Sequence, residues 1–169
     1  MKYEIAYLSN SGNTAVLAKA IASMLPADDT HLTDLSLDDV SESADVYFIG
    51  FGINRGMVPM KIMDSLECAD GKTAILFATC GMEPTDAYKS SIERKILPFI
   101  PDDCDYKGLF LCAGQFSETV ANNIKETLRR QPENAQARAL LESYQKTYGH
   151  PNSEDLEDLQ DFVWEALSY

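Results

Sequence analysis

The chain has 169 residues, 45% of them hydrophobic, which suits one globular domain with a sizeable core. Its 27 acidic residues outnumber its 14 basic residues, so the formal net charge is -13 at pH 7. This charge argues against nucleic acids and anionic membranes as partners, and it fits either a partner with basic patches or solubility alone.

The first third of the chain predicts three strands and one helix. Residues 2–8 (KYEIAYL) favour a strand, and apolar residues then recur at helical spacing from Thr14 until Pro26. A short strand is predicted at 31–35. Residues 45–51 (DVYFIGF) form a near-continuous apolar run, which is typical of a strand covered on both faces of a sheet.

The middle of the chain continues this alternation. A helix is predicted at 59–69, a second buried strand at 72–79 (KTAILFAT), and a helix at 85–99. A fifth strand is predicted at 107–113 (KGLFLCA). Such alternation predicts parallel strands with right-handed crossovers, in a doubly wound open sheet of the α/β class with helices on both faces. The strand order stays open on this evidence alone.

The last third of the chain predicts helices and no further strand. Three helical segments follow one another, at 117–130, 132–147 and 153–167. Pro132 suits a first helical residue, and the Gly-His-Pro-Asn stretch at 149–152 is a break. We therefore expect a single domain over 1–169, with the sheet in 1–115 and a helical C-terminus in 116–169.

The stretch SNSGNT lies between the first strand and the first helix, where open parallel sheets bind ligands. A phosphate there would meet free N–H groups and the positive end of the helix dipole. A helix cap is the alternative, but a cap needs one polar residue, whereas this loop supplies several around a glycine. The residues expected to bind phosphate are Ser9, Asn10, Ser11, Gly12, Asn13 and Thr14.

This loop resembles the phosphate loop of flavodoxins, Ser/Thr-x-Thr-Gly-Asn-Thr, with Ser11 in place of the middle threonine. The order of predicted elements is similar as well. Flavodoxin is itself a known example of the doubly wound order 2-1-3-4-5, with FMN bound where the strand order reverses. The resemblance covers about residues 1–115 and implies this strand order and an FMN cofactor.

Three further segments resemble a subgroup of flavodoxin-like proteins. They are 50–56 (GFGINRG), 112–114 (CAG) and 150–156 (HPNSEDL). The subgroup is similar to the accessory flavodoxin-like proteins that accompany bilirubin reductases in gut bacteria. This resemblance implies a role in support of a larger reductase.

The resemblance also implies where a flavin ring would lie, between the loops after the third and fourth strands. In flavodoxins a carbonyl of the first of these loops turns toward flavin N5 in the one-electron-reduced form; a plain glycine turn is the alternative here. The backbone of the second loop would reach the polar edge of the ring. The residues concerned are Phe51, Gly52, Ile53, Asn54, Arg55 and Gly56 in the first loop, and Thr79, Cys80, Gly81 and Met82 in the second.

Two features depart from the flavodoxin pattern. Arg55 would place a cation near the ring, which would favour the anionic hydroquinone and raise the reduction potential of the flavin. The alternative is that Arg55 points to solvent or pairs with an acidic residue. No aromatic residue stands where a stacking tyrosine is expected, although Phe51, Tyr88 and Phe116 are candidates. Core packing is the alternative for each of these three rings.

The cysteines, the N-terminus and the lengths of the apolar runs bear on the cellular compartment. The four cysteines form neither a CxxC pair nor a zinc-like spacing, so reduced, buried thiols and no metal site are expected. The N-terminus lacks the pattern of a signal peptide, and no apolar run approaches the roughly 20 residues that cross a bilayer. The sequence therefore predicts a cytoplasmic protein.

Taken with the resemblance, these patterns favour an FMN-binding electron carrier that works with a redox partner protein. The flavin would do the chemistry, so no catalytic residue is predicted. An accessory protein of a larger reductase and an NAD(P)H-dependent FMN oxidoreductase remain alternatives, and the helical C-terminus would suit either. A phosphorelay receiver is disfavoured, because Ser9-Asn10 stands where that function needs two acids. The oligomeric state is left open.

Overall fold

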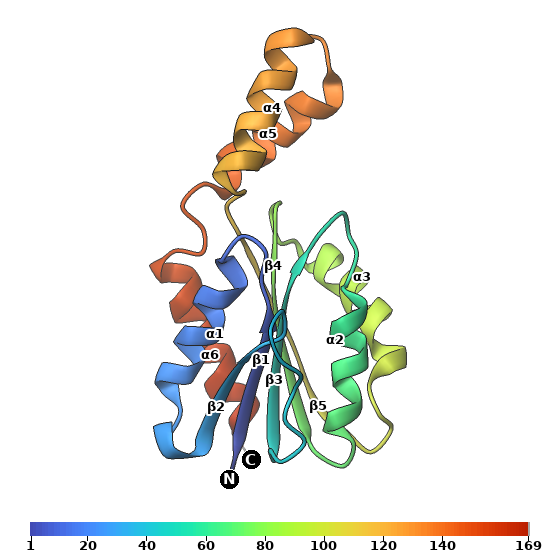
Figure 1. Ribbon diagram of the computed structural model, residues 1–169, viewed down its shortest axis with the longest axis vertical. Helices are drawn as coiled ribbons and strands as arrows, with labels where there is room; N and C mark the ends of the chain where they lie inside the picture. Colours follow the sequence, from blue (N-terminus) through green and yellow to red (C-terminus); the bar gives the residue numbers. More distant parts are fainter. Residues whose placement is uncertain (169) are drawn as a thin grey trace.

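A five-stranded parallel sheet lies at the centre of the computed structural model, which describes residues 1–168 (Figure 1). Its strand order is β2-β1-β3-β4-β5, which confirms the order implied by the resemblance to flavodoxins. All four neighbouring pairs of strands are parallel. The strands are β1 (Tyr3–Leu8), β2 (Thr30–Asp34), β3 (Val46–Ile53), β4 (Thr73–Cys80) and β5 (Asp105–Ala113).

Helices cover both faces of the sheet (Figure 1). One face carries α1 (Asn13–Met24) and α6 (Ser153–Leu167), and the other carries α2 (Met60–Ser65) and α3 (Asp86–Ile96). Short 3-10 turns follow α1, α2 and α3, at Ala27–Asp29, Leu66–Ala69 and Leu97–Phe99. The predicted helices at 59–69 and 85–99 therefore each end in a 3-10 turn.

Burial on both faces explains the continuous apolar run of β3. Val46 and Phe48 pack against the layer of α1 and α6, whereas Tyr47 and Ile49 pack against the layer of α2 and α3. Gly50 is the one position of β3 at which a side chain has no room. An added Cβ would lie 2.1 Å from Cε2 of Phe77, its register partner on β4.

The helices α4 (Glu118–Arg130) and α5 (Ala135–Thr147) form a hairpin that projects beyond the carboxyl edge of the sheet (Figure 1). The two helices pack on each other, and neither has an extensive contact with a strand. The second helix begins at Ala135 rather than at the predicted Pro132, because the Asn134 side chain caps it by accepting a hydrogen bond from the Ala137 N–H. Within residues 1–168, no helix has the length and apolar character needed to span a membrane.

Candidate functional site

The loop between β1 and α1 leaves backbone donors open at the start of a helix. Its turn is made by Gly12, whose φ of 89° is left-handed, and the Ser9 hydroxyl accepts from the N–H groups of Gly12 and Ala15 at 3.2 and 3.3 Å. Among residues 1–168 no acceptor is found for the backbone N–H groups of Ser11, Asn13 and Thr14. A cap would satisfy such groups, so the loop has the geometry of an anion site.

The Asn13 side chain joins this loop to the segment after β5. Its amide nitrogen donates to the Ser11 hydroxyl at 3.1 Å and to the Gln115 carbonyl at 2.8 Å, which uses both of its hydrogens. Gly114 makes this approach possible, since an added Cβ would lie 2.6 Å from Nδ2 of Asn13. We therefore expect the Asn13 side chain to hold the loop in place, while its backbone N–H has no acceptor among the described residues.

A buried pair of threonines brings the first helix to the carboxyl end of β4. The hydroxyls of Thr14 and Thr79 lie 3.0 Å apart, and both residues are almost fully buried. Gly52 at the end of β3 is the third member of this junction, because an added Cβ would lie 3.7 and 3.8 Å from these two hydroxyls. The structure thus brings together the predicted phosphate loop and the two loops predicted to contact a flavin ring.

The first of the two loops predicted to contact a flavin ring forms a tight turn over residues 54–57. The Met57 N–H donates to the Asn54 carbonyl at 2.9 Å, and the two central residues, Arg55 and Gly56, have φ values of 53° and 70°. Two left-handed residues are the pattern of a type I′ turn, and for Arg55 this backbone costs roughly 1–2 kcal/mol. The turn is held from outside by Lys95 of α3, whose ammonium donates to the Gly56 carbonyl at 2.6 Å.

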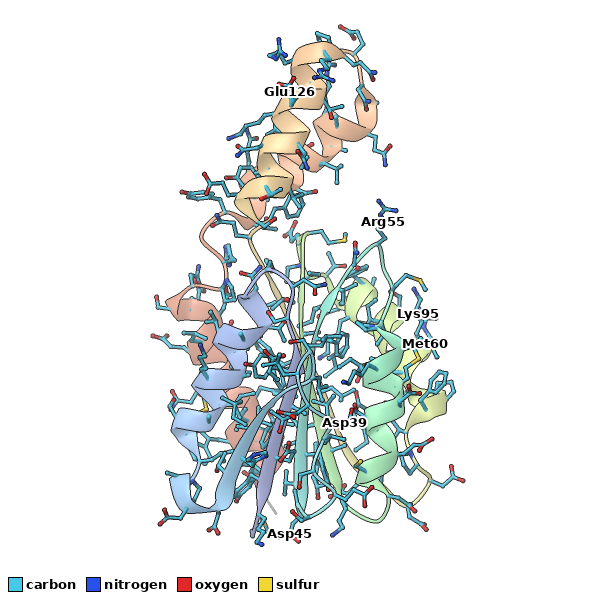
Figure 2. The ribbon with its side chains drawn as sticks, in the orientation of Figure 1. Asp39, Asp45, Arg55, Met60, Lys95 and Glu126 are labelled. Carbon is cyan, nitrogen blue, oxygen red and sulfur yellow. The ribbon has the colours of Figure 1, made fainter. Side chains whose placement is uncertain are left out.

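The side chains of this first loop point in different directions. Phe51 is fully buried in the core, so only its backbone is available to a ligand. Figure 2 shows Arg55 at the carboxyl edge of the sheet, directed away from it into solvent. No acidic partner of Arg55 is present in the described part of the chain. The exposed alternative for this arginine therefore fits the structure.

The second of these predicted loops, after β4, is covered by the ring of Phe116. An added Cβ at Gly81 would lie 2.4 Å from Cε1 of Phe116, so this ring packs directly on the loop. Met82 is exposed, whereas Cys80 is buried and its thiol donates to the Met82 carbonyl at 3.3 Å. Burial raises the pKa of the Cys80 thiol to about 11. This confirms Cys80 as a buried thiol, because a nucleophile would need a lowered pKa.

The raised pKa of Cys80 predicts a loss of stability in alkali. A thiol whose pKa rises from 9.0 unfolded to about 11 folded favours the native state below pH 9, and this contribution disappears as the pH rises through about 11. The free energy of unfolding of the wild type should therefore fall between these pH values by about 2–3 kcal/mol more than that of Cys80→Ala. Urea unfolding of both proteins across this pH range measures the difference. An equal fall in the free energy of unfolding with pH for the two proteins would contradict the prediction.

Two contacts of the site could not be found from sequence patterns. Lys95 and Gly56 are 39 residues apart, and Asn13 and Gln115 are 102 residues apart. Gln115 also fixes the C-terminal end of the hairpin, because its N–H donates to the His150 carbonyl and its side chain accepts from the Gly149 N–H, at 2.8 and 2.9 Å. Neither a lysine nor a glutamine carries a local signal for such a role.

Comparison with known proteins gives matches over nearly the whole chain. A family model described as a flavodoxin domain matches residues 4–164. The flavodoxin-like domain-containing protein BilS of Clostridioides difficile (strain CD3) is 29% identical over 168 residues, which cover 96% of this chain and 94% of that protein. BilS of Clostridium symbiosum (strain WAL-14163) is 25% identical over 180 residues, with the same coverage of both chains.

A solved structure gives independent support for the fold. Oxidised flavodoxin 2 from Bacillus cereus superposes with a TM-score of 0.53 and 19% sequence identity, covering 98% of this chain and 97% of that one. At this identity the similarity shows the fold alone. The BilS matches extend through the helical hairpin to the C-terminal helix, beyond the part of the chain that carries the phosphate-loop motif.

Proposed function

The chain belongs to the flavodoxin domain family, and from this premise we propose that it binds FMN and passes electrons to or from a redox partner protein of the cytoplasm. The observation that carries the proposal is the junction at the carboxyl edge of the sheet. There the open N–H groups of the β1–α1 loop lie beside the ends of β3 and β4. Such a junction is where open α/β sheets bind ligands.

The described residues fit the two ends of FMN. The backbone N–H groups of Ser11, Asn13 and Thr14 would hold the phosphate, and the open space beside Gly12, where an added Cβ meets nothing within 4 Å, leaves room for it. The ring would lie between the 54–57 turn and the Gly81–Met82 segment. FMN, when bound, supplies the capacity to accept and donate electrons one at a time.

The residues around the ring loops suit binding and electron transfer better than acid–base catalysis. The Cys80 thiol is kept protonated by burial, and Lys95 is engaged with a backbone carbonyl. Arg55 is exposed at the carboxyl edge of the sheet. Transfer of an electron through an exposed ring edge needs no proton donor at a fixed position, so this side-chain set is sufficient.

An accessory role in support of a larger reductase, such as a bilirubin reductase, is the second candidate. It is favoured by the BilS relatives, which match over the hairpin as well as the sheet. A pure accessory protein would stimulate the reductase even when no FMN is present. A carrier would stimulate it only when loaded with FMN, so assays of bilirubin reductase with both forms of the protein separate the two roles.

The test of the proposed function is a titration of the purified protein with FMN, followed by anaerobic reduction in the presence of an electron acceptor. We expect one FMN to bind with quenched fluorescence, and the reduced complex to pass its electrons on. Riboflavin, which lacks the phosphate, should bind much more weakly, because it cannot use the N–H groups of the β1–α1 loop. Failure to bind FMN would overturn the proposal, and binding without transfer would favour the accessory role.

A further inference from the structure

Three aromatic rings form a continuous cluster at the base of the α4–α5 hairpin, where the chain enters and leaves it (Figure 1). The ring centroids of Phe116 and Tyr144 lie 6.0 Å apart, and those of Tyr144 and Tyr148 lie 5.9 Å apart with an angle of 82° between the ring planes. Both separations are typical of favourable aromatic pairs. The ammonium of Lys125 lies 5.5 Å from the centroid of Tyr144, so Tyr144 is the centre of the cluster and Tyr148 is its outer member.

Tyr148 is the member of the cluster that is open to a ligand. It is 65% exposed, whereas the other two rings are half-buried. Its backbone is nevertheless fixed on both sides. The preceding residue, Thr147, is buried, and the N–H of the following residue, Gly149, donates to the Gln115 side chain at 2.9 Å. A ring held in this way can pack on a flat ligand at little cost in conformational entropy.

The two ends of the cluster lie at the two parts of the proposed FMN site. At one end, the Phe116 ring packs on Gly81 of the loop after β4, since a Cβ added there would lie 2.4 Å from its Cε1. At the other end, the residue after Tyr148 donates to Gln115, whose carbonyl accepts from the Asn13 side chain of the β1–α1 loop. The cluster therefore reaches from the predicted phosphate loop to the loop after β4, along the carboxyl edge of the sheet.

We propose that Tyr148 stacks on the isoalloxazine ring of bound FMN, with Tyr144 and Phe116 packed behind it. The inference rests on the proposed function, because it names a contact of the same cofactor. The hairpin then supplies the aromatic surface that the loops after β3 and β4 do not offer. Phe51 is fully buried and Tyr88 packs against the same core, so both of these rings are engaged in core packing.

Stacking and phosphate binding act on different parts of the flavin. A tyrosine packs on the flat ring in an offset geometry, and this ring is common to FMN and riboflavin. The β1–α1 loop acts on the phosphate, which riboflavin lacks. A loss of the Tyr148 ring should therefore weaken both flavins to the same extent, whereas the loop variant Ser9→Ala/Ser11→Ala should weaken FMN alone.

The test is a fluorescence titration of FMN and of riboflavin into the full chain and into its Tyr148→Ala variant. The variant should bind each flavin about 10-fold more weakly, which is the order of the contribution of one stacked aromatic pair and the area that it buries. The emission of the bound flavin should also rise, because the tyrosine that quenches it is gone. Tyr148→Phe keeps a flat ring, so it should retain the affinity for both flavins.

A matched control removes another exposed ring. Phe99 is 46% exposed in the 3-10 turn that precedes β5, at the opposite edge of the sheet, so Phe99→Ala should leave both affinities unchanged. Thermal unfolding without flavin should give nearly equal Tm values for the wild type and Tyr148→Ala, since most of the Tyr148 ring is exposed. This equality shows that a lost affinity does not come from a lost fold.

Three results would overturn the stacking while FMN binding by the wild type upheld the proposed function. They are an unchanged flavin affinity in Tyr148→Ala, a loss for FMN without a loss for riboflavin, and a loss in Tyr148→Phe as large as in Tyr148→Ala. A wild type that binds no FMN would overturn both the stacking and the proposed function.

Discussion

FMN should bind the Ser9→Ala/Ser11→Ala variant at least about 100-fold more weakly than the wild type. Both hydroxyls accept hydrogen bonds within the loop, from backbone N–H groups at Ser9 and from the Asn13 amide at Ser11, so their own hydrogens are free to donate to a ligand. A hydrogen bond to a charged group contributes about 1.5–3 kcal/mol. Two such losses, about 3 kcal/mol together, correspond to a factor of about 100 in affinity.

The measurement is a fluorescence titration of FMN into both proteins, repeated with riboflavin. The affinity for riboflavin should change little, because riboflavin lacks the phosphate to which the two serine hydroxyls would donate. A matched control is Ser41→Ala/Ser43→Ala, which removes another hydrogen-bonded pair of serines, 2.9 Å apart, in the loop before β3. If the loop variant kept its affinity for FMN, the β1–α1 loop would not be the phosphate site.

Gly50→Ala should lower the free energy of unfolding by about 3 kcal/mol, the upper part of the range for overpacked cores. The new Cβ would lie 2.1 Å from the Phe77 ring, which is fully buried and held between α1, α6 and the sheet, so the ring cannot move aside without displacing neighbours. For a chain of this size that loss corresponds to a fall in Tm of roughly 6–12 °C.

Thermal and urea unfolding measure this effect against two controls. Gly52→Ala adds the same methyl group two residues further along β3, where its nearest neighbour is 3.7 Å away, and should be nearly neutral. Phe77→Leu should recover part of the loss when combined with Gly50→Ala, which shows that the clash is with this ring. Equal stability of the Gly50 and Gly52 variants would contradict the explanation.

The sheet could be predicted from the sequence because its signals are local. The apolar runs of β3 and β4 reflect burial on both faces, and Pro26 marks the end of the first helix. The predicted 153–167 helix has the bounds of α6. The β1–α1 loop stays a predicted phosphate site, and it stands out in the sequence because its polar residues are consecutive in the chain.

The packing of the three C-terminal helices could not be predicted from local sequence patterns. All three helices were expected, but their periodicity does not reveal that α6 covers the sheet beside α1 while α4 and α5 leave it. That division follows from contacts between distant residues, such as the 5.8 Å approach of the Phe110 and Phe162 rings. The hydrogen bond from Lys95 to the Gly56 carbonyl is likewise a tertiary contact that no local sequence pattern predicts.

The link between Gln115 and residues 149–150 has a consequence for how the chain is built. Two hydrogen bonds, at 2.8 and 2.9 Å, bring the entry and exit of the hairpin together at one point. Without the segment between them, β5 would connect directly to α6 through a short crossover, and the strand register would not change. The hairpin is therefore an excursion of the chain whose two ends meet at one point, a place where a segment can be shortened or exchanged without changing the order of the strands.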